Sequence, residues 1–197
     1  MAENLKVTHY RNGDEIPYPS DDDWGSYDEG QYSVYDNDPA NADIYGNLYN
    51  WAVIVDDRGV CPDGYHIPSD DEWTILTDFI APEGANSGPY NDNSIAGEKM
   101  KSTGTIQDGD GLWNTHYTPW GVPMGTNESG FTGLPGGYRE IEYGYYGSMG
   151  YSGSFWSSTE DGSGSAWYRI LTYHDLSLSR YNFCGSNTGF SIRCLGD

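Results

Sequence analysis

The chain has 197 residues, of which 30 are acidic and 9 are basic, so its formal net charge is −21. This charge argues against binding of nucleic acid or of an anionic membrane through bulk electrostatics. No stretch of the sequence approaches the ~18 consecutive apolar residues of a transmembrane helix. The chain is rich in aromatic residues and glycine, with 18 Tyr, 7 Trp and 27 Gly, which is typical of loop-rich folds and of binding surfaces built from loops. Solubility in a medium of high cation concentration is an alternative reason for the charge.

The N-terminal part of the chain is polar, acidic and punctuated by proline and glycine up to residue 44. We expect a strand around residues 6–10 and then a long loop. Apolar residues at positions 48, 51, 52 and 55 have the spacing of one helical face, which predicts a short helix within residues 45–55.

The clearest local signal is a capping box. Ser69 is followed three residues later by Glu72, and each side chain can accept a hydrogen bond from the backbone N–H of the other residue. Trp73, Leu76 and Ile80 then share one helical face. The pattern predicts a helix over residues 69–80 with these three side chains buried.

Short elements dominate the rest of the chain. We expect a short helix at 96–100 and two strands joined by a tight glycine turn within 131–139. Further strands are predicted at 155–158, 166–173 and 189–195. The absence of an internal repeat or a linker predicts one domain over residues 1–197.

Six patches in fixed order carry a resemblance to a known family. They lie at residues 45–51, 61–73, 127–131, 134–139, 155–160 and 189–194. With them the chain resembles the Fibrobacter succinogenes major paralogous domain, which is related to the formylglycine-generating-enzyme version of the C-type lectin fold.

The resemblance implies an α+β fold of the C-type lectin type. Such a fold has two helices, a small twisted antiparallel sheet, long irregular loops and termini that lie close together. The resemblance also implies that Cys61 and Cys194 lie near each other, as a disulfide or as two buried thiols.

Members of this fold group include variable proteins of diversity-generating retroelements. In these proteins a reverse transcriptase randomises adenines near the C-terminus, typically in Asn codons, and the changes never yield Lys, Glu, Gln, Met or Trp. None of these five residue types occurs between positions 168 and 187. The resemblance therefore implies a variable, ligand-binding segment at about residues 161–187.

The strand predicted at 166–173 sharpens this expectation, because alternate residues of a strand face opposite sides of a sheet. The odd-numbered residues look like family scaffold, whereas the even-numbered ones are chemically mixed, as a variable surface would be. The expected variable residues on this strand and the loop after it are Tyr168, Ile170, Thr172, His174, Asp175, Ser177, Ser179, Tyr181, Phe183, Cys184 and Gly185. An ordinary polar strand in a non-diversified family member is the alternative.

We expect no catalytic activity. The formylglycine-generating relatives bind copper with two cysteines near the C-terminus, and the pair that this chain offers there, Cys184 and Cys194, is unconvincing. The four histidines lack metal-ligand spacing, and we expect His66 to make a structural hydrogen bond.

We expect no cofactor. The tripeptides Glu-Pro-Asn and Gln-Pro-Asp, with which lectins of this fold bind sugar through calcium, are absent. A structural calcium ion among the carboxylates of residues 21–23, 36–38 or 108–110 is left open, with turn formation and solubility as equal explanations.

The predicted function is therefore binding of a protein or glycan on another cell surface, by a protein that is extracellular, on a cell surface or on a virion. We expect the protein neither to bind nucleic acid nor to insert into a membrane. A non-diversified surface or adhesion domain of a larger secreted protein is the alternative.

Overall fold

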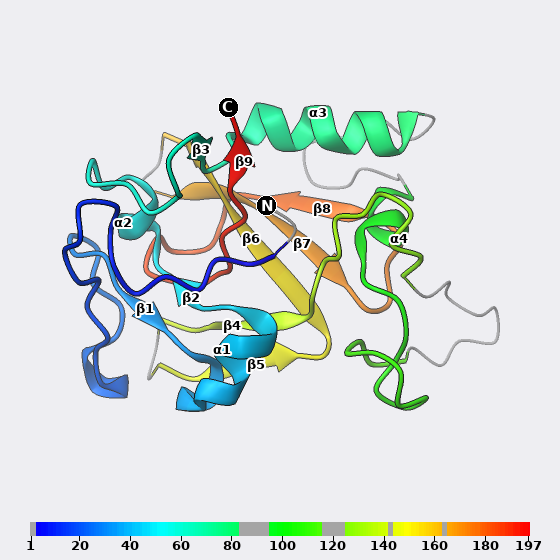
Figure 1. Cartoon of the computed structure of the whole chain (residues 1–197), viewed down its shortest axis with the longest axis horizontal. Coiled ribbons are helices and arrows are strands. Elements are labelled where there is room, and N and C mark those ends of the chain that lie inside the picture. The colour runs from blue at the N-terminus through cyan, green and yellow to red at the C-terminus, as the bar shows by residue number, and fades with distance from the viewer. Residues whose placement is uncertain (1–2, 83–94, 116–124, 142–143, 163–164) are drawn as a thin grey trace.

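The fold is built around a five-stranded sheet with strand order β5-β4-β6-β7-β8 (Figure 1). Neighbouring strands run antiparallel, except for β4 and β6, which are parallel. The strands are β4 (Gly136–Arg139), β5 (Tyr146–Met149), β6 (Ser152–Glu160), β7 (Ala166–Thr172) and β8 (Leu178–Tyr181). The computed structural model describes residues 3–82, 95–115, 125–141, 144–162 and 165–197.

The protein is mixed α+β, as predicted, but its sheets are more extensive than the small sheet that we expected. Two further strand pairs, β1–β2 and β3–β9, flank the main sheet. They consist of β1 (Tyr32–Ser33), β2 (Leu48–Tyr49), β3 (Tyr65–His66) and β9 (Leu195–Gly196). Instead of two helices, the described residues form the 3-10 helices η1 (Asp21–Asp23) and η2 (Tyr35–Asn37) and the α-helices α1 (Pro39–Tyr45), α2 (Trp51–Ile54), α3 (Asp70–Ile80) and α4 (Ala96–Met100).

Helix α3 begins where the capping box predicts. The Ser69 hydroxyl accepts a hydrogen bond from the Glu72 N–H at 3.2 Å, and the Glu72 carboxylate accepts one from the Ser69 N–H at 2.8 Å. Trp73 is buried against Phe155 of β6 and Leu171 of β7, in a cluster that also includes Met100 of α4. Helix α3 thus covers one face of the sheet.

The helix predicted within residues 45–55 is wrong in its first half. Helix α1 ends at Tyr45 and is followed by its C-cap Gly46 (φ 79°), where a side chain would come within 2.8 Å of the Leu5 carbonyl oxygen. Tyr49 then exchanges both backbone hydrogen bonds with Phe190, at 2.8 and 3.0 Å. Pairing with a distant segment overrides the helical spacing, and only Trp51–Ile54 of the predicted range is helical.

The strand predicted around residues 6–10 does not form, because this part of the chain makes only an isolated bridge between His9 and Glu15. The N-terminal segment runs beside the C-terminal one, where the Leu5 N–H donates to the Ile192 carbonyl at 2.9 Å. The two ends of the described chain therefore lie close together, as Figure 1 shows.

The predicted strands at 155–158 and 166–173 correspond to β6 and β7. The range 189–195 instead contains isolated bridges and the start of β9. The glycine turn predicted within 131–139 is also wrong: Gly136 and Gly137 lie in β4. Gly137 has a φ of 67°, and a side chain there would clash with the Gly147 carbonyl on β5.

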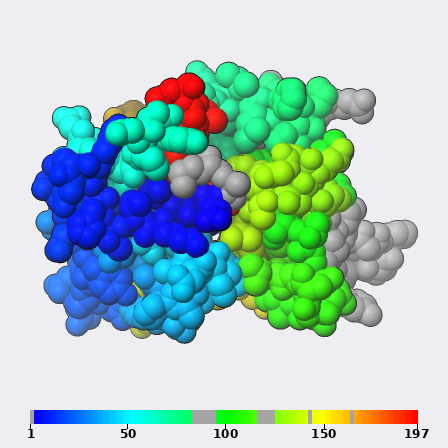
Figure 2. Space-filling model, in the orientation of Figure 1, coloured from blue at the N-terminus to red at the C-terminus, as the bar shows by residue number. Residues whose placement is uncertain are grey.

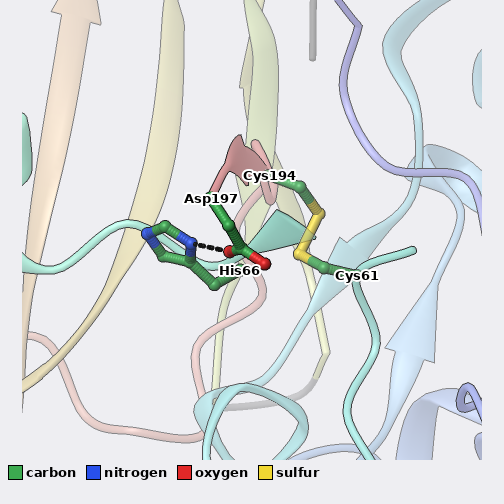
Figure 3. Close-up of a disulfide and its surroundings, with 4 residues drawn as sticks. All are labelled: Cys61, His66, Cys194 and Asp197. Atoms are coloured by element: carbon green, nitrogen blue, oxygen red, sulfur yellow. Dashed lines mark hydrogen bonds and ion pairs between the residues drawn. A yellow bond between two sulfur atoms is a disulfide. The ribbon is translucent and has the colours of Figure 1, made fainter. Parts of the chain in front are cut away.

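Cys61 and Cys194 form a disulfide that joins the β3 region to the C-terminal segment (Figure 3). Next to it, His66 Nδ1 and Asp197 Oδ1 are 2.7 Å apart, and His66 Nε2 lies 2.9 Å from Glu72 Oε1. His66 therefore makes hydrogen bonds to the C-terminal residue and to the cap of α3. These two contacts raise its pKa, because both carboxylates favour the protonated ring.

Figure 2 shows one face of the molecule. Blue and cyan N-terminal residues form its left part, helix α3 its upper edge, and green and yellow-green residues much of its right part, with the red C-terminal end between the cyan residues and α3. Among the described residues, no helix is long and apolar enough to cross a membrane.

Candidate functional site

Strand β7 presents different side chains to the two sides of the sheet. Arg169 and Leu171 face α3, where the Arg169 guanidinium donates to the Asp70 carboxylate at 2.6 Å. Tyr168 and Ile170 face the other side and pack into a second cluster, around Phe190. The alternation that the sequence predicted along this strand is present in the structure.

A pocket of about 470 Å³ opens on the Ile170 side of the sheet. Its floor comes from β4, β6 and β7, and its walls come from the segments that follow β4 and β8. It is lined by Tyr138, Glu140, Ile141, Ser152, Ser154, Ile170, Phe183, Cys184, Gly185, Thr188 and Phe190. Mostly apolar concave sites with a few polar groups are the usual form of a ligand-binding site.

Four of the predicted variable residues line this pocket, namely Ile170, Phe183, Cys184 and Gly185. Phe183 is the most exposed of them, with 68% of its surface accessible. Its ring contacts Tyr181 with centroids 5.0 Å apart, and Tyr181 in turn lies 5.9 Å from Tyr168. The segment after β8 thereby contacts the sheet through a chain of edge-on and tilted rings.

Three predicted variable residues are buried, contrary to our expectation of a surface. Tyr168 is 1% exposed, because Trp156 and Phe190 cover its ring at centroid distances of 5.9 and 4.9 Å. Ser177, just before β8, and Ser179, within it, are each 5% exposed. Strand alternation identifies the face of a residue, but it does not tell which part of that face is covered by other segments.

The remaining four predicted residues lie outside the pocket lining: Thr172 ends β7, His174 and Asp175 lie in the turn from β7 to β8, and Tyr181 ends β8. Lys101, 2% exposed, fixes this turn by donating from Nζ to the carbonyl oxygens of Thr172 (3.0 Å) and Asp175 (2.7 Å). Burial lowers the pKa of Lys101 to about 8, because an ammonium group loses hydration there. Sequence reasoning missed Lys101, since nothing in its local pattern marks it as buried.

Cys184 is a free thiol whose Sγ lies 3.0 Å from the Tyr168 hydroxyl. Burial raises its pKa, which disfavours the nucleophilic thiolate. Cys194 is bonded to Cys61, so Cys184 and Cys194 do not form the pair that a copper site of the formylglycine-generating type would need.

Gly185 lies close to the pocket wall. A side chain at this position would come within 2.5 Å of Ile141 Cδ1 and 2.8 Å of Asn187 Oδ1. Substitution of Gly185 therefore displaces Ile141 and changes the shape of the pocket.

The acidic stretches at which a calcium ion was left open make local and structural contacts. Asp21 accepts from Arg139 at 2.6 Å, and Asp108 accepts from the Thr105 hydroxyl at 2.6 Å. Asp38 caps α1 by accepting from the Ala40 N–H at 3.0 Å. Within the described ranges, no group of three or more His, Cys, Asp or Glu side chains is placed to hold a metal ion.

The rest of the pocket lining was not predicted. Glu140 stands out because it is exposed, accepts a hydrogen bond from Tyr138 at 3.2 Å and is the only charged side chain among the described lining residues. Sequence alone does not bring β4, β6 and the 183–190 segment together. The one available signal was that Tyr138, Phe190 and their neighbours belong to the patches shared with the family.

A family model, the Fibrobacter succinogenes major domain, matches residues 1–195 of the chain. Comparisons with curated proteins and with solved structures find no match.

Proposed function

The chain belongs to the Fibrobacter succinogenes major domain family, and we propose that it is a ligand-binding variable protein of a diversity-generating retroelement, built on a C-type lectin scaffold. The β3–β9 pair, which joins residues 65–66 to the C-terminal strand, and the packing of α3 on the sheet support the scaffold assignment. The expected partner is a protein or glycan on another cell surface. The expected location is extracellular, on a cell surface or on a virion.

One observation carries the proposal: a pocket of about 470 Å³ lies where the segment free of Lys, Glu, Gln, Met and Trp meets the sheet. Ile170, Phe183, Cys184 and Gly185 come from this segment. The other lining residues come from outside it and provide a constant frame. An aromatic side chain such as Phe183 supplies contact area at a small cost in conformational entropy.

The burial of Tyr168, Ser177 and Ser179 narrows the proposed variable surface. The contact set that we propose is Ile170, Thr172, His174, Asp175, Tyr181, Phe183, Cys184 and Gly185. Substitutions at the three buried positions would act on folding instead of on ligand contact.

The DNA around the coding sequence tests the proposal. We expect a reverse transcriptase gene and a near-copy of the segment that encodes residues 155–194, differing from it at adenines. The differences should include the codons of Ile170, Phe183 and Cys184. An intact gene neighbourhood with no such copy would remove diversification from the proposal.

A fixed surface or adhesion domain is the second candidate, and the burial of three of the predicted variable residues, Tyr168, Ser177 and Ser179, favours it. In that case the same pocket binds one constant ligand. Sequencing of this gene from independent isolates separates the candidates: identical codons at positions 170, 183 and 184 fit the fixed domain, and varied ones fit the diversified protein.

A further inference from the structure

The described lining of the pocket combines apolar walls with one negative charge and no positive charge. Tyr138, Ile170 and Phe190 contribute apolar surface, and no Lys, Arg or His belongs to the described lining. Glu140 carries the charge, and the hydrogen bond from the Tyr138 hydroxyl fixes one of its carboxylate oxygens. Among the described residues, no lysine, arginine or histidine side chain lies within 4.0 Å of the Glu140 carboxylate.

From this arrangement we propose that the pocket receives a basic side chain, Lys or Arg, of a protein partner; the inference rests on the proposed binding function. The methylene stem of such a side chain packs along the apolar wall while its charged end reaches the rim. Glu140 pairs with that end, and the rings of Tyr138 and Phe183 offer faces for cation–π contact.

The charge of the whole chain favours the same class of partner. A net charge of −21 attracts basic segments and repels anionic ligands such as phosphorylated or sulfated groups. The volume of about 470 Å³ accommodates one long side chain together with its backbone. Charge and shape thus favour a protruding basic residue on a protein surface.

Cys184 provides a reporter inside the pocket, because it is the one cysteine of the chain outside the disulfide. The probe is N-acetyl-arginine methylamide, and the readout is the rate at which iodoacetamide alkylates Cys184 in the intact, oxidised protein. We expect the arginine probe to slow alkylation in a saturable manner and its uncharged citrulline counterpart to do so at least threefold less effectively. Equal protection by the two probes, or protection by neutral methyl glycosides without protection by the arginine probe, would overturn the proposal.

A pair of matched variants locates the recognition. Glu140→Gln should weaken protection by about two- to fivefold, the usual range for a partly exposed ion pair. Glu160→Gln removes the same charge from the exposed end of β6, outside the pocket, and should leave protection unchanged. Equal losses in both variants would show that bulk charge, not the pocket, attracts the probe.

A second pair of variants tests whether the apolar pocket wall contacts the probe, and melting temperatures control for effects on folding. Phe183→Ala should weaken protection, whereas Phe79→Ala, which removes an 85% exposed ring from α3, should not. Unchanged melting temperatures identify the losses as losses of contact. If the arginine probe gives no protection while the gene neighbourhood holds the diversified repeat, the proposed ligand class is wrong and the proposed function stands. If the repeat is absent and the probe binds, diversification is wrong and the proposed ligand class stands.

Discussion

The two faces of the central sheet differ in how completely they are buried. On the α3 face, Trp73, Phe155 and Leu171 are buried in one cluster, and the buried Asp70 carboxylate pairs with Arg169 and Arg180. On the opposite face, one half is closed by rings around Tyr168, and the other half, around Ile170, opens into the pocket. Two residues of one strand, only two positions apart on the same face, therefore have opposite roles.

This difference teaches where the chain can tolerate change. A closed face loses stability when any side chain changes volume, because interiors are packed as tightly as crystals. An open pocket wall exchanges one side chain for another at little cost to folding. A binding surface that varies must therefore lie on the open half, supported by the closed face behind it.

Of the changes considered, removal of the Asp70 charge should lower the free energy of unfolding the most. Asp70→Asn leaves the buried Arg169 without its ion partner and should lower the free energy of unfolding by about 3–5 kcal/mol, as measured by urea denaturation. Asp71→Asn, at the next and exposed position of the same helix, is the matched control and should cost well under 1 kcal/mol. Similar costs for both would mean that the ion pairs do not hold α3 to the sheet.

The same carboxylate predicts a pH dependence. Burial raises the pKa of Asp70, but the hydrogen bond from Arg180 and the charge of Arg169 outweigh it and hold the pKa below its usual value. Its contribution is therefore complete above pH ~4 and is lost as the pH falls through the lower pKa of the folded protein. The stability of Asp70→Asn should lack this component of the acid transition.

The two halves of the pocket face can be compared directly by truncating one ring in each. Tyr168→Ala empties a fully buried site and should cost about 3–5 kcal/mol of unfolding free energy. Phe183→Ala removes a ring that is 68% exposed and should cost less than about 1 kcal/mol. A large loss of unfolding free energy in Phe183→Ala would contradict the view that side chains on the open half can vary without loss of folding.

The disulfide should stabilise the fold as a whole, because it closes a loop between positions separated by 133 residues. Its removal in the double variant Cys61→Ser, Cys194→Ser should lower the free energy of unfolding by about 2–4 kcal/mol. Cys184→Ser is the control and should change it by less than about 1 kcal/mol. Under reducing conditions, the free energy of unfolding of the wild type should fall toward that of the double variant, whereas that of the double variant should not change.

The smallest effect is expected at His66. Its pKa is raised in the folded protein, so its contacts with Asp197 and Glu72 stabilise the fold below pH ~6.5, the unfolded value. This stabilisation is lost as the pH rises through the higher folded pKa. His66→Gln should therefore differ from the wild type by a few tenths of a kcal/mol at pH 5.5, since the ring is partly exposed, and by less at pH 9.

Sequence reasoning succeeded where the determinants are local. The capping box of Ser69 and Glu72 marks the start of α3, and the alternation along β7 separates Arg169 from Ile170. It failed where distant segments decide the structure: Tyr49 pairs with Phe190 in place of a helical turn, and the order of the sheet follows no local pattern.

The candidate site was predictable only in part for the same reason. The composition of residues 168–187 marked the segment that contributes Ile170 and Phe183. It could not show that Phe190 closes over Tyr168 or that Glu140 approaches the pocket from the end of β4. Burial and convergence are properties of the assembled sheet and not of any one strand.

The most direct test of the account is a comparison of two displayed libraries. One library randomises Ile170, Thr172, Phe183 and Cys184, and the other randomises the closed positions Trp156, Tyr168, Leu171 and Leu178. Protease resistance measures the folded fraction of each. We predict that most members of the first library remain folded and that nearly all members of the second do not; equal loss in the two libraries would contradict a variable binding surface at the pocket.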